Sequence, residues 1–181
     1  MIEVTGVNKM FGEIKALDNI VATIQEGSIF GLIGTNGAGK STLLCVISGV
    51  LKPDTGMALV DGENVYENPQ AKAKIFFLPD NAYFFQNATA KVMAEYYQVI
   101  YPQFDMERFR EMISGFGLEF TRKLSTFSKG MKRQVALLLG ICAGTKYLIC
   151  DESFDGLDPV VRQAVKSIFA SEILKRDFTP I

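Results

Sequence analysis

A glycine-rich segment carries a lysine and neighbouring hydroxyls at a spacing that suits phosphate binding. The segment fits the pattern G-x-x-x-x-G-K-[ST] and consists of Gly34, Thr35, Asn36, Gly37, Ala38, Gly39, Lys40, Ser41 and Thr42. Its glycines let backbone N–H groups converge on phosphate oxygens, and the N-terminus of a following helix adds positive potential. In this pattern Lys40 reaches the β- and γ-phosphates of a nucleotide, and Ser41 binds Mg²⁺. The segment predicts a phosphate-binding loop, and a glycine-rich turn that binds nothing is the alternative.

The sequence on either side of this loop predicts the elements that must position it. Residues 28–33 form a largely apolar run that predicts a buried strand. After the loop, apolar residues follow with helical spacing at Leu43, Leu44, Val46 and Ile47. Strand, loop and helix in this order are the context that the pattern requires, so the sequence favours phosphate binding over a plain turn.

Two adjacent carboxylates follow a second apolar run, residues 147–150. Because ligands bind at the carboxyl ends of strands in open α/β sheets, we expect Asp151 and Glu152 to face the ligand. Asp151 would position Mg²⁺ through water, and Glu152 would polarise the attacking water as a general base. Without the phosphate loop, two solvated surface acids would be the better interpretation. With it, the pair indicates a P-loop NTPase.

The first part of the chain is rich in strand signals. Residues 2–7 and 19–24 are β-type stretches around a turn that contains Gly12, and they predict an antiparallel edge. Residues 57–60 and 75–78 are further strand candidates, and we expect the second of them in the centre of a sheet. The fold class expected is α/β, with a mostly parallel core sheet and an N-terminal antiparallel β subdomain.

The second part of the chain changes to helical spacing. Residues 89–142 carry apolar side chains on single helical faces, which predicts an inserted helical subdomain at about residues 85–140. Asp158 followed by Pro159 is typical of a helix start, with the aspartate as N-cap. A chain of 181 residues suffices for one substantial core, so we expect a single domain over residues 1–181.

The composition excludes several classes of protein. A net charge of -1 offers no bulk attraction to nucleic acid. The longest apolar run, residues 135–143, falls short of the roughly 20 residues that a membrane span needs, and no secretory signal is visible, so we expect the cytoplasm. Cys45, Cys142 and Cys150 lie far apart among apolar residues and are expected to be buried, reduced thiols.

Two further segments carry a resemblance to a known family. Residues 127–134 read Phe-Ser-Lys-Gly-Met-Lys-Arg-Gln and resemble, in divergent form, the signature L-S-G-G-Q of ATP-binding cassette (ABC) ATPases. Residues 151–159 resemble the Walker B motif of that family running into its D-loop. With the phosphate loop and the order of strands and helices, the resemblance covers essentially the whole chain.

The resemblance implies a role for each matching residue. Phe11 would stack on the adenine of ATP, although a core aromatic is the alternative. Ser128 and Gly130 would bind the γ-phosphate held by a second copy, and Ser128 would also serve as a helix N-cap. Asp158 would lie near the partner's phosphate loop. The family therefore works as head-to-tail dimers that enclose two ATP molecules.

The chain also departs from the family pattern. Lys129 and Met131 replace the usual glycine and glutamine of the signature, while the serine and second glycine remain. Asp80 stands where the family places a glutamine that senses magnesium and the attacking water, and its carboxylate is expected to bind metal or to accept from that water. Ser153 replaces a common proline. The sequence has 0 histidines, whereas the family carries a switch histidine, and we expect that the C-terminal end of the family unit is missing here.

The resemblance leaves three functions open. The preferred one is the ATPase subunit of an ABC transporter, which binds ATP and Mg²⁺, pairs with a second nucleotide-binding subunit and works peripherally on the inner face of the cell membrane through transmembrane permease subunits. A soluble ABC ATPase that acts on nucleic acid or ribosomes is the second. The third is a regulatory ATP-binding module with little hydrolysis, suggested by Asp80 and the missing histidine.

Overall fold

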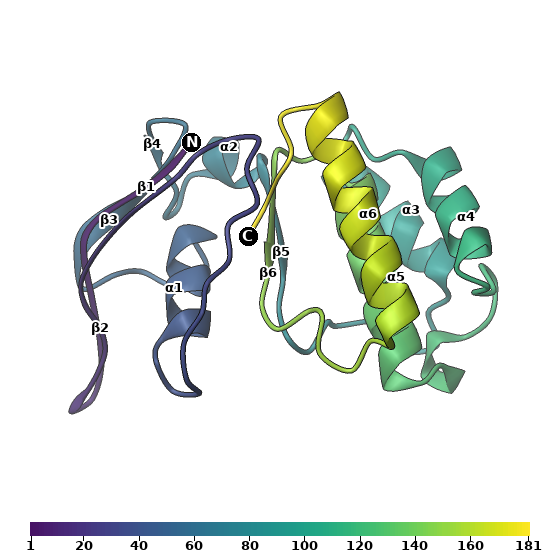
Figure 1. The fold of residues 1–181 in the computed structure, drawn as a ribbon, viewed down its shortest axis with the longest axis horizontal. Coiled ribbons are helices and arrows are strands. Elements are labelled where there is room, and N and C mark those ends of the chain that lie inside the picture. Colours follow the sequence, from purple (N-terminus) through teal and green to yellow (C-terminus); the bar gives the residue numbers. More distant parts are fainter.

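The computed structural model describes all residues, 1–181, and contains two β-sheets with helices beside them. Figure 1 shows the first sheet with α1 at one end, strands β5 and β6 in the middle, and helices α3 to α6 at the other end. None of the helices combines the length and the apolarity that a transmembrane span requires. The arrangement confirms the expected α/β fold.

The first sheet is antiparallel, with the order β2-β1-β3-β4. Its strands are β1 (Ile2–Phe11), β2 (Ile14–Ile24), β3 (Thr55–Val60) and β4 (Glu63–Asn64). The alternation of apolar and polar residues turns Ile2, Val4 and Val60 into the core. The predicted antiparallel edge is confirmed, and both of its strands extend to the turn at Gly12, whose φ is +59°.

The second sheet is parallel, with the order β5-β6-β7. Its strands are β5 (Ile75–Leu78), β6 (Tyr147–Cys150) and β7 (Thr179–Pro180). The prediction that residues 75–78 occupy the centre of the sheet is wrong, because β5 lies at an edge and β6 is central. Continuous apolarity reports that both faces of a strand are covered, and it carries no information on how many strands lie beside it.

The strand predicted at residues 28–33 is not formed. This segment is extended, but its backbone bonding to the parallel sheet is a single hydrogen bond, in which Phe30 N donates to Pro180 O over 3.0 Å. Its neighbour β7 has two residues, and one is a proline that lacks an N–H donor. Without a ladder, Ile29 and Ile33 remain 65% and 96% exposed.

The helices gather mainly after β5. They are α1 (Lys40–Ile47), α2 (Pro69–Lys72), α3 (Ala90–Ile100), α4 (Met106–Gly115), the 3₁₀ turn η1 (Leu124–Thr126), α5 (Lys129–Cys142) and α6 (Pro159–Lys175). Helix α5 is the most deeply enclosed, because every residue from Arg133 to Cys142 is buried. At Gly140, an added Cβ would lie 2.7 Å from Leu148 Cδ1, so α5 packs closely on β6. The limits of the helical subdomain at residues 85–140 stay a prediction.

Strand β6 lies between two hydrophobic clusters. Tyr147 and Ile149 belong to the cluster beneath the antiparallel sheet and α1. Leu148, between them in the strand, belongs to the larger cluster formed with the helices. Because successive side chains of a strand point to opposite faces, this short strand joins both cores and delivers the carboxylates at its end to the space between them.

Candidate functional site

The phosphate-loop segment connects the extended residues 28–33 to α1. Gly39 is the N-cap of α1 with φ +85°, and Gly37 has φ +83°. A Cβ on Gly39 would lie 2.3 Å from the carbonyl oxygen of Ala16, so only glycine fits at this position. Residues 34–38 are exposed, and within them Ala38 N donates to Thr35 O over 3.2 Å, which closes a turn of the loop.

The ammonium group of Lys40 is hydrogen-bonded to the backbone of the phosphate loop. Its Nζ donates to the carbonyl oxygens of Gly34 and Thr35, each over 2.9 Å. The ammonium group therefore lies over the loop rather than in bulk solvent, at the N-terminus of α1 where negative charge is favoured. This placement agrees with a phosphate-binding lysine.

Ser41 meets the first carboxylate of the acidic pair. Ser41 Oγ donates to Asp151 Oδ1 over 3.0 Å, although 110 residues separate them in the chain, and Asp151 is 8% exposed. A hydroxyl and a carboxylate oxygen are hard oxygen ligands of the kind that Mg²⁺ prefers, so the donor set fits this ion. The structure has no group of three or more His, Cys, Asp or Glu residues that could hold a metal ion.

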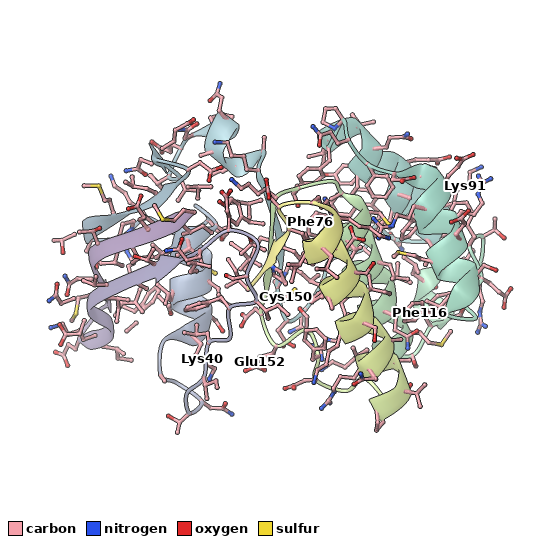
Figure 2. All side chains as sticks on the ribbon, turned by 45° about the horizontal axis from the view of Figure 1, so that its top comes forward. Lys40, Phe76, Lys91, Phe116, Cys150 and Glu152 are labelled. Atoms are coloured by element: carbon pink, nitrogen blue, oxygen red, sulfur yellow. The ribbon has the colours of Figure 1, made fainter.

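Glu152 lies exposed beside this pair. Figure 2 shows Lys40 and Glu152 at the lower edge of the view, below Cys150, the last residue of β6. Both residues line a hollow of about 460 Å³ that Asp151 and residues 29–32 also border. The backbone of Glu152 has φ +50°, a left-handed conformation that costs energy for a residue with a side chain and is typical of functional sites. Glu152 therefore occupies a strained backbone position at the edge of a hollow that Lys40 also lines.

Phe11 stands at the end of β1 and is 48% exposed, with Lys9 Nζ 5.8 Å from the ring centroid. The exposure excludes the interpretation as a core aromatic. Stacking on adenine stays a prediction.

The remaining nucleotide-contacting candidates start helices. Ser128 is the N-cap of α5 and accepts from Met131 N over 3.2 Å, and Asp158 is the N-cap of α6 and accepts from two backbone N–H groups. A Cβ on Gly130 would lie 3.2 Å from Gly156 O, so the start of α5 lies close to residues 151–158. The N-cap predictions are confirmed. The binding of a partner's nucleotide stays a prediction.

Asp80 faces the guanidinium group of Arg133, a residue outside the predicted site. One carboxylate oxygen forms an ion pair with Arg133 of α5, and the other accepts from Asn81 Nδ2 over 3.1 Å. In the sequence, Arg133 is one of the polar residues that precede the apolar run of residues 135–143. The only signal that could have identified it is its position, with Gln134, on the buried side of the helix. A role of Asp80 at magnesium stays a prediction.

The cysteines are all free, as expected, but only Cys142 is fully buried, while Cys45 and Cys150 are half-buried. Burial raises the pKa of the Cys142 thiol to about 12, so this thiol stays protonated and unreactive. Burial, and to a lesser degree the charge of Asp151, also raises the pKa of Cys45 in α1. Cys150, the last residue of β6, borders the same hollow as Lys40 and Glu152.

The comparisons with known proteins agree with this geometry. The family model described as "ABC transporter" matches residues 17–155, which span the phosphate loop, the signature segment and the acidic pair. The chain belongs to the ABC transporter family of ATP-binding proteins. This ABC chain is 33% identical over 177 residues to the ABC transporter ATP-binding protein YtrB of Bacillus subtilis, and 29% identical over 182 residues to the bacitracin transport ATP-binding protein BcrA of Bacillus licheniformis.

These relatives are longer than the ABC chain described here. The alignments cover 98% and 99% of this chain but 61% of YtrB and 60% of BcrA. Among solved structures, an ATP-binding subunit of an ABC transporter superposes with a TM-score of 0.88 at 22% identity, covering 99% of this chain and 77% of the other. An ABC transporter protein from Pyrococcus furiosus gives 0.83 at 23% identity, with 99% and 90% covered. The two superpositions confirm the fold.

Proposed function

We propose that this chain binds and hydrolyses ATP as a subunit of an ABC transporter and drives transmembrane partners through ATP-dependent closure of a dimer. The observation that carries the proposal is the meeting of Ser41 with Asp151 beneath the loop that Lys40 closes. The names of the relatives, which describe ATP-binding proteins of transport systems, support it.

Each residue of the proposed site has its own role in the binding and hydrolysis of ATP. Magnesium-bound ATP supplies the phosphoryl group and the electrophilic phosphorus when it is bound. The backbone N–H groups of the phosphate loop and the ammonium of Lys40 would hold the phosphates, while Ser41 would bind Mg²⁺ and Asp151 would position it through water. Glu152 accepts the proton of the attacking water as general base, for which its exposed carboxylate has access to the hollow.

A second nucleotide-binding subunit is part of this proposal. Ser128 and Asp158 lie exposed at the starts of α5 and α6, where helix N-termini favour anions. Their side chains are bonded only to their own helix starts. The start of α5 at Ser128 would meet a phosphate held by another copy, and Asp158 would lie near the phosphate loop of that copy. Gly130, close to Gly156, keeps the surface at the start of α5 free of bulky side chains.

The transmembrane partner is proposed from an exposed apolar surface on the segment after β5 and on α3. The large exposed side chains there are Tyr83, Phe85, Tyr96, Val99 and Ile100. An apolar hollow of about 250 Å³ lies beside them, bordered by Phe84 and Tyr97 among others. Exposed apolar patches of this kind mark interaction surfaces, and we propose that permease subunits of the cell membrane bind here from its inner, cytoplasmic face.

The substitution Glu152→Gln tests the proposed reaction. It removes the general base while keeping size and hydrogen bonding, so ATP should bind normally, hydrolysis should fall by about 10²-fold or more, and ATP-bound dimers should accumulate. Size-exclusion chromatography with Mg²⁺ and ATP measures the dimers, and phosphate release measures the turnover. Lys40→Ala is the matched control, since it should abolish binding and yield no dimers. Undiminished turnover in Glu152→Gln would remove this residue from the mechanism.

A second candidate function is a regulatory ATP-binding module with little turnover. It is favoured by one observation, the pairing of Asp80 with Arg133 at the position where the sensing glutamine is expected. Wild-type protein that binds ATP and dimerises but releases no phosphate would support this candidate over the first.

A further inference from the structure

Arg133 is a buried cation within the first turns of α5. The residue is 7% exposed, and its guanidinium has three acceptors on two other segments. Its Nη2 donates to the carboxylate of Asp80 and, over 2.9 Å, to the carbonyl oxygen of the same residue. Its Nη1 donates to the carbonyl oxygen of Asp155. One side chain therefore joins α5 to the segment after β5 and to the loop after β6.

The three segments that meet at Arg133 each carry residues of the proposed site. Helix α5 begins at the signature residues, with Ser128 as its N-cap. The loop that contains Asp155 lies between Glu152 and Asp158. The segment after β5 contains Asp80 and leads to the exposed surface around Tyr83 that we propose for the membrane partner.

We propose that Arg133 is a positioning residue that couples the segment after β5 to the catalytic loop of residues 151–158, and that Asp80 serves as its partner rather than as a magnesium ligand. This inference rests on the proposed function. It names the residues through which movement at the partner surface reaches Glu152 and Asp158.

The bonding explains why the coupling is rigid. Both carboxylate oxygens of Asp80 already have protein donors, Arg133 and Asn81. A buried guanidinium that lost an acceptor would keep its desolvation cost. Moving Asp80 away from Arg133 would therefore destabilise the fold, so the two side chains should move together. The planar fork of arginine holds its acceptors in fixed directions, so a shift of Asp80 also displaces the carbonyl of Asp155.

Packing around the guanidinium supports the same path. A Cβ on Gly156, the residue after Asp155, would lie 3.9 Å from Arg133 Nη1, and Gly156 has φ +72°. The loop therefore turns directly against the guanidinium. Asp80, Arg133 and Ser153 also border one small hollow of about 90 Å³. Ser153 follows Glu152 in the chain, so the ion pair of Asp80 with Arg133 lies close to the proposed general base.

Hydrogen exchange of residues 151–158 in Asp80→Ala tests the coupling without nucleotide. Asp80 is half-exposed and Asp80→Ala leaves Arg133 its two backbone acceptors, the carbonyl oxygens of residue 80 and Asp155, so this variant should fold. Exchange at the amides of Asp155 and Leu157, which donate to backbone carbonyls within the loop, should rise several-fold although the substitution lies in another segment. Arg133→Lys, which keeps the charge but not the fork, should raise exchange in both segments. Unchanged exchange of residues 151–158 in Asp80→Ala would overturn the inference.

Asp54→Ala is the matched control. Asp54 is a carboxylate of similar exposure that pairs with Lys9 on the antiparallel sheet, away from the loop. Its removal should leave exchange of residues 151–158 unchanged. An equal rise in this control would show general loosening of the fold and would also overturn the inference.

The magnesium dependence separates positioning from metal binding. In Asp80→Ala the Mg²⁺ concentration that half-saturates nucleotide binding should stay at the wild-type value, whereas kcat should fall several-fold with KM for ATP unchanged. Asp80→Asn, which keeps an acceptor for Arg133, should recover part of kcat. A raised magnesium requirement in Asp80→Ala would make Asp80 a metal ligand and refute the proposal. If wild-type protein binds no nucleotide, the proposed function fails, and the exchange experiment still decides the coupling.

Discussion

At the scale of single residues, the site depends on atoms that lie far apart in the chain. Ser41 comes from the loop and Asp151 from the end of β6, and their oxygens meet 3.0 Å apart. The motif predicted both as partners of magnesium, because each follows its own local pattern. The motif could not predict Arg133 as the partner of Asp80, because nothing near either residue in sequence points to the other.

Ser41→Ala should weaken magnesium-dependent nucleotide binding. The substitution removes one of the two oxygens that meet at the proposed metal position, so the Kd for ATP with Mg²⁺ should rise about tenfold, while binding without Mg²⁺ should change little. Titration of a fluorescent ATP analogue with and without Mg²⁺ measures both. Ser48→Ala is the control, because that buried hydroxyl of the same region bonds only to Cys45 O. Equal weakening with and without magnesium would contradict the metal role.

At the scale of elements, the strand predictions show when the local sequence pattern is enough to predict a strand and when it is not. The antiparallel pair of β1 and β2 contains its own turn, so its alternation and Gly12 predict it from nearby residues. Residues 28–33 have the same apolarity as a buried strand, but β7 offers them a single backbone acceptor. A strand exists only where a neighbour supplies the other half of the ladder, so this prediction was wrong for a reason outside the segment.

Gly140→Ala should destabilise the packing of α5 on the parallel sheet. The added methyl would lie 2.7 Å from Leu148 Cδ1 and 3.1 Å from Phe76 Cδ1, and both side chains are buried. The expected loss in free energy of unfolding is about 1–3 kcal/mol, measured by urea denaturation. Gly115→Ala in α4 is the control: nothing lies within 4 Å of its Cβ position, so only the helix-favouring effect of alanine should appear. A stabilised Gly140→Ala variant would contradict the close packing.

At the scale of the whole molecule, the carboxylate of Glu172 connects α6 to α4 through an ion pair with Arg108. Glu172 is 1% exposed at its side chain and accepts from Arg108 of α4 over 2.8 Å and from Arg176 over 3.0 Å. Arg176 in turn donates to the carbonyl oxygens of Ile141 and Thr145. Burial opposes ionisation of Glu172, but the two guanidinium groups outweigh it and hold the pKa of this carboxyl below its usual value.

Glu172→Gln should therefore cost stability in a pH-dependent way. Because the pKa is lowered in the folded protein, the contribution of Glu172 is present above its ordinary value of 4.5 and is lost as pH falls through the lowered one. At pH 7 the variant should lose roughly 3 kcal/mol, and the difference from wild type should shrink in acid. Urea denaturation at several pH values between about 3 and 7 measures this difference in the free energy of unfolding. Glu119→Gln, an exposed partner of Arg122, should show no such difference, and a pH-independent loss in Glu172→Gln would refute the ionic origin.

The sequence by itself determined the features that adjacent residues create. Gly37 and Gly39 provide the left-handed backbone of the phosphate loop, Ser128 and Asp158 cap their own helices, and the apolar run of β6 ends in its two carboxylates. Each of these depends on interactions within a few residues, so its pattern is readable in the chain.

Only the tertiary structure decided which distant groups meet. It brought Ser41 to Asp151, enclosed Arg133 between Asp80 and Asp155, and left residues 28–33 without a ladder. These outcomes depend on how strands and helices pack, and the free energy of that packing comes from contacts between segments far apart in sequence. For that reason the phosphate-binding chemistry was predictable from the residues, whereas the connection between its loops was not.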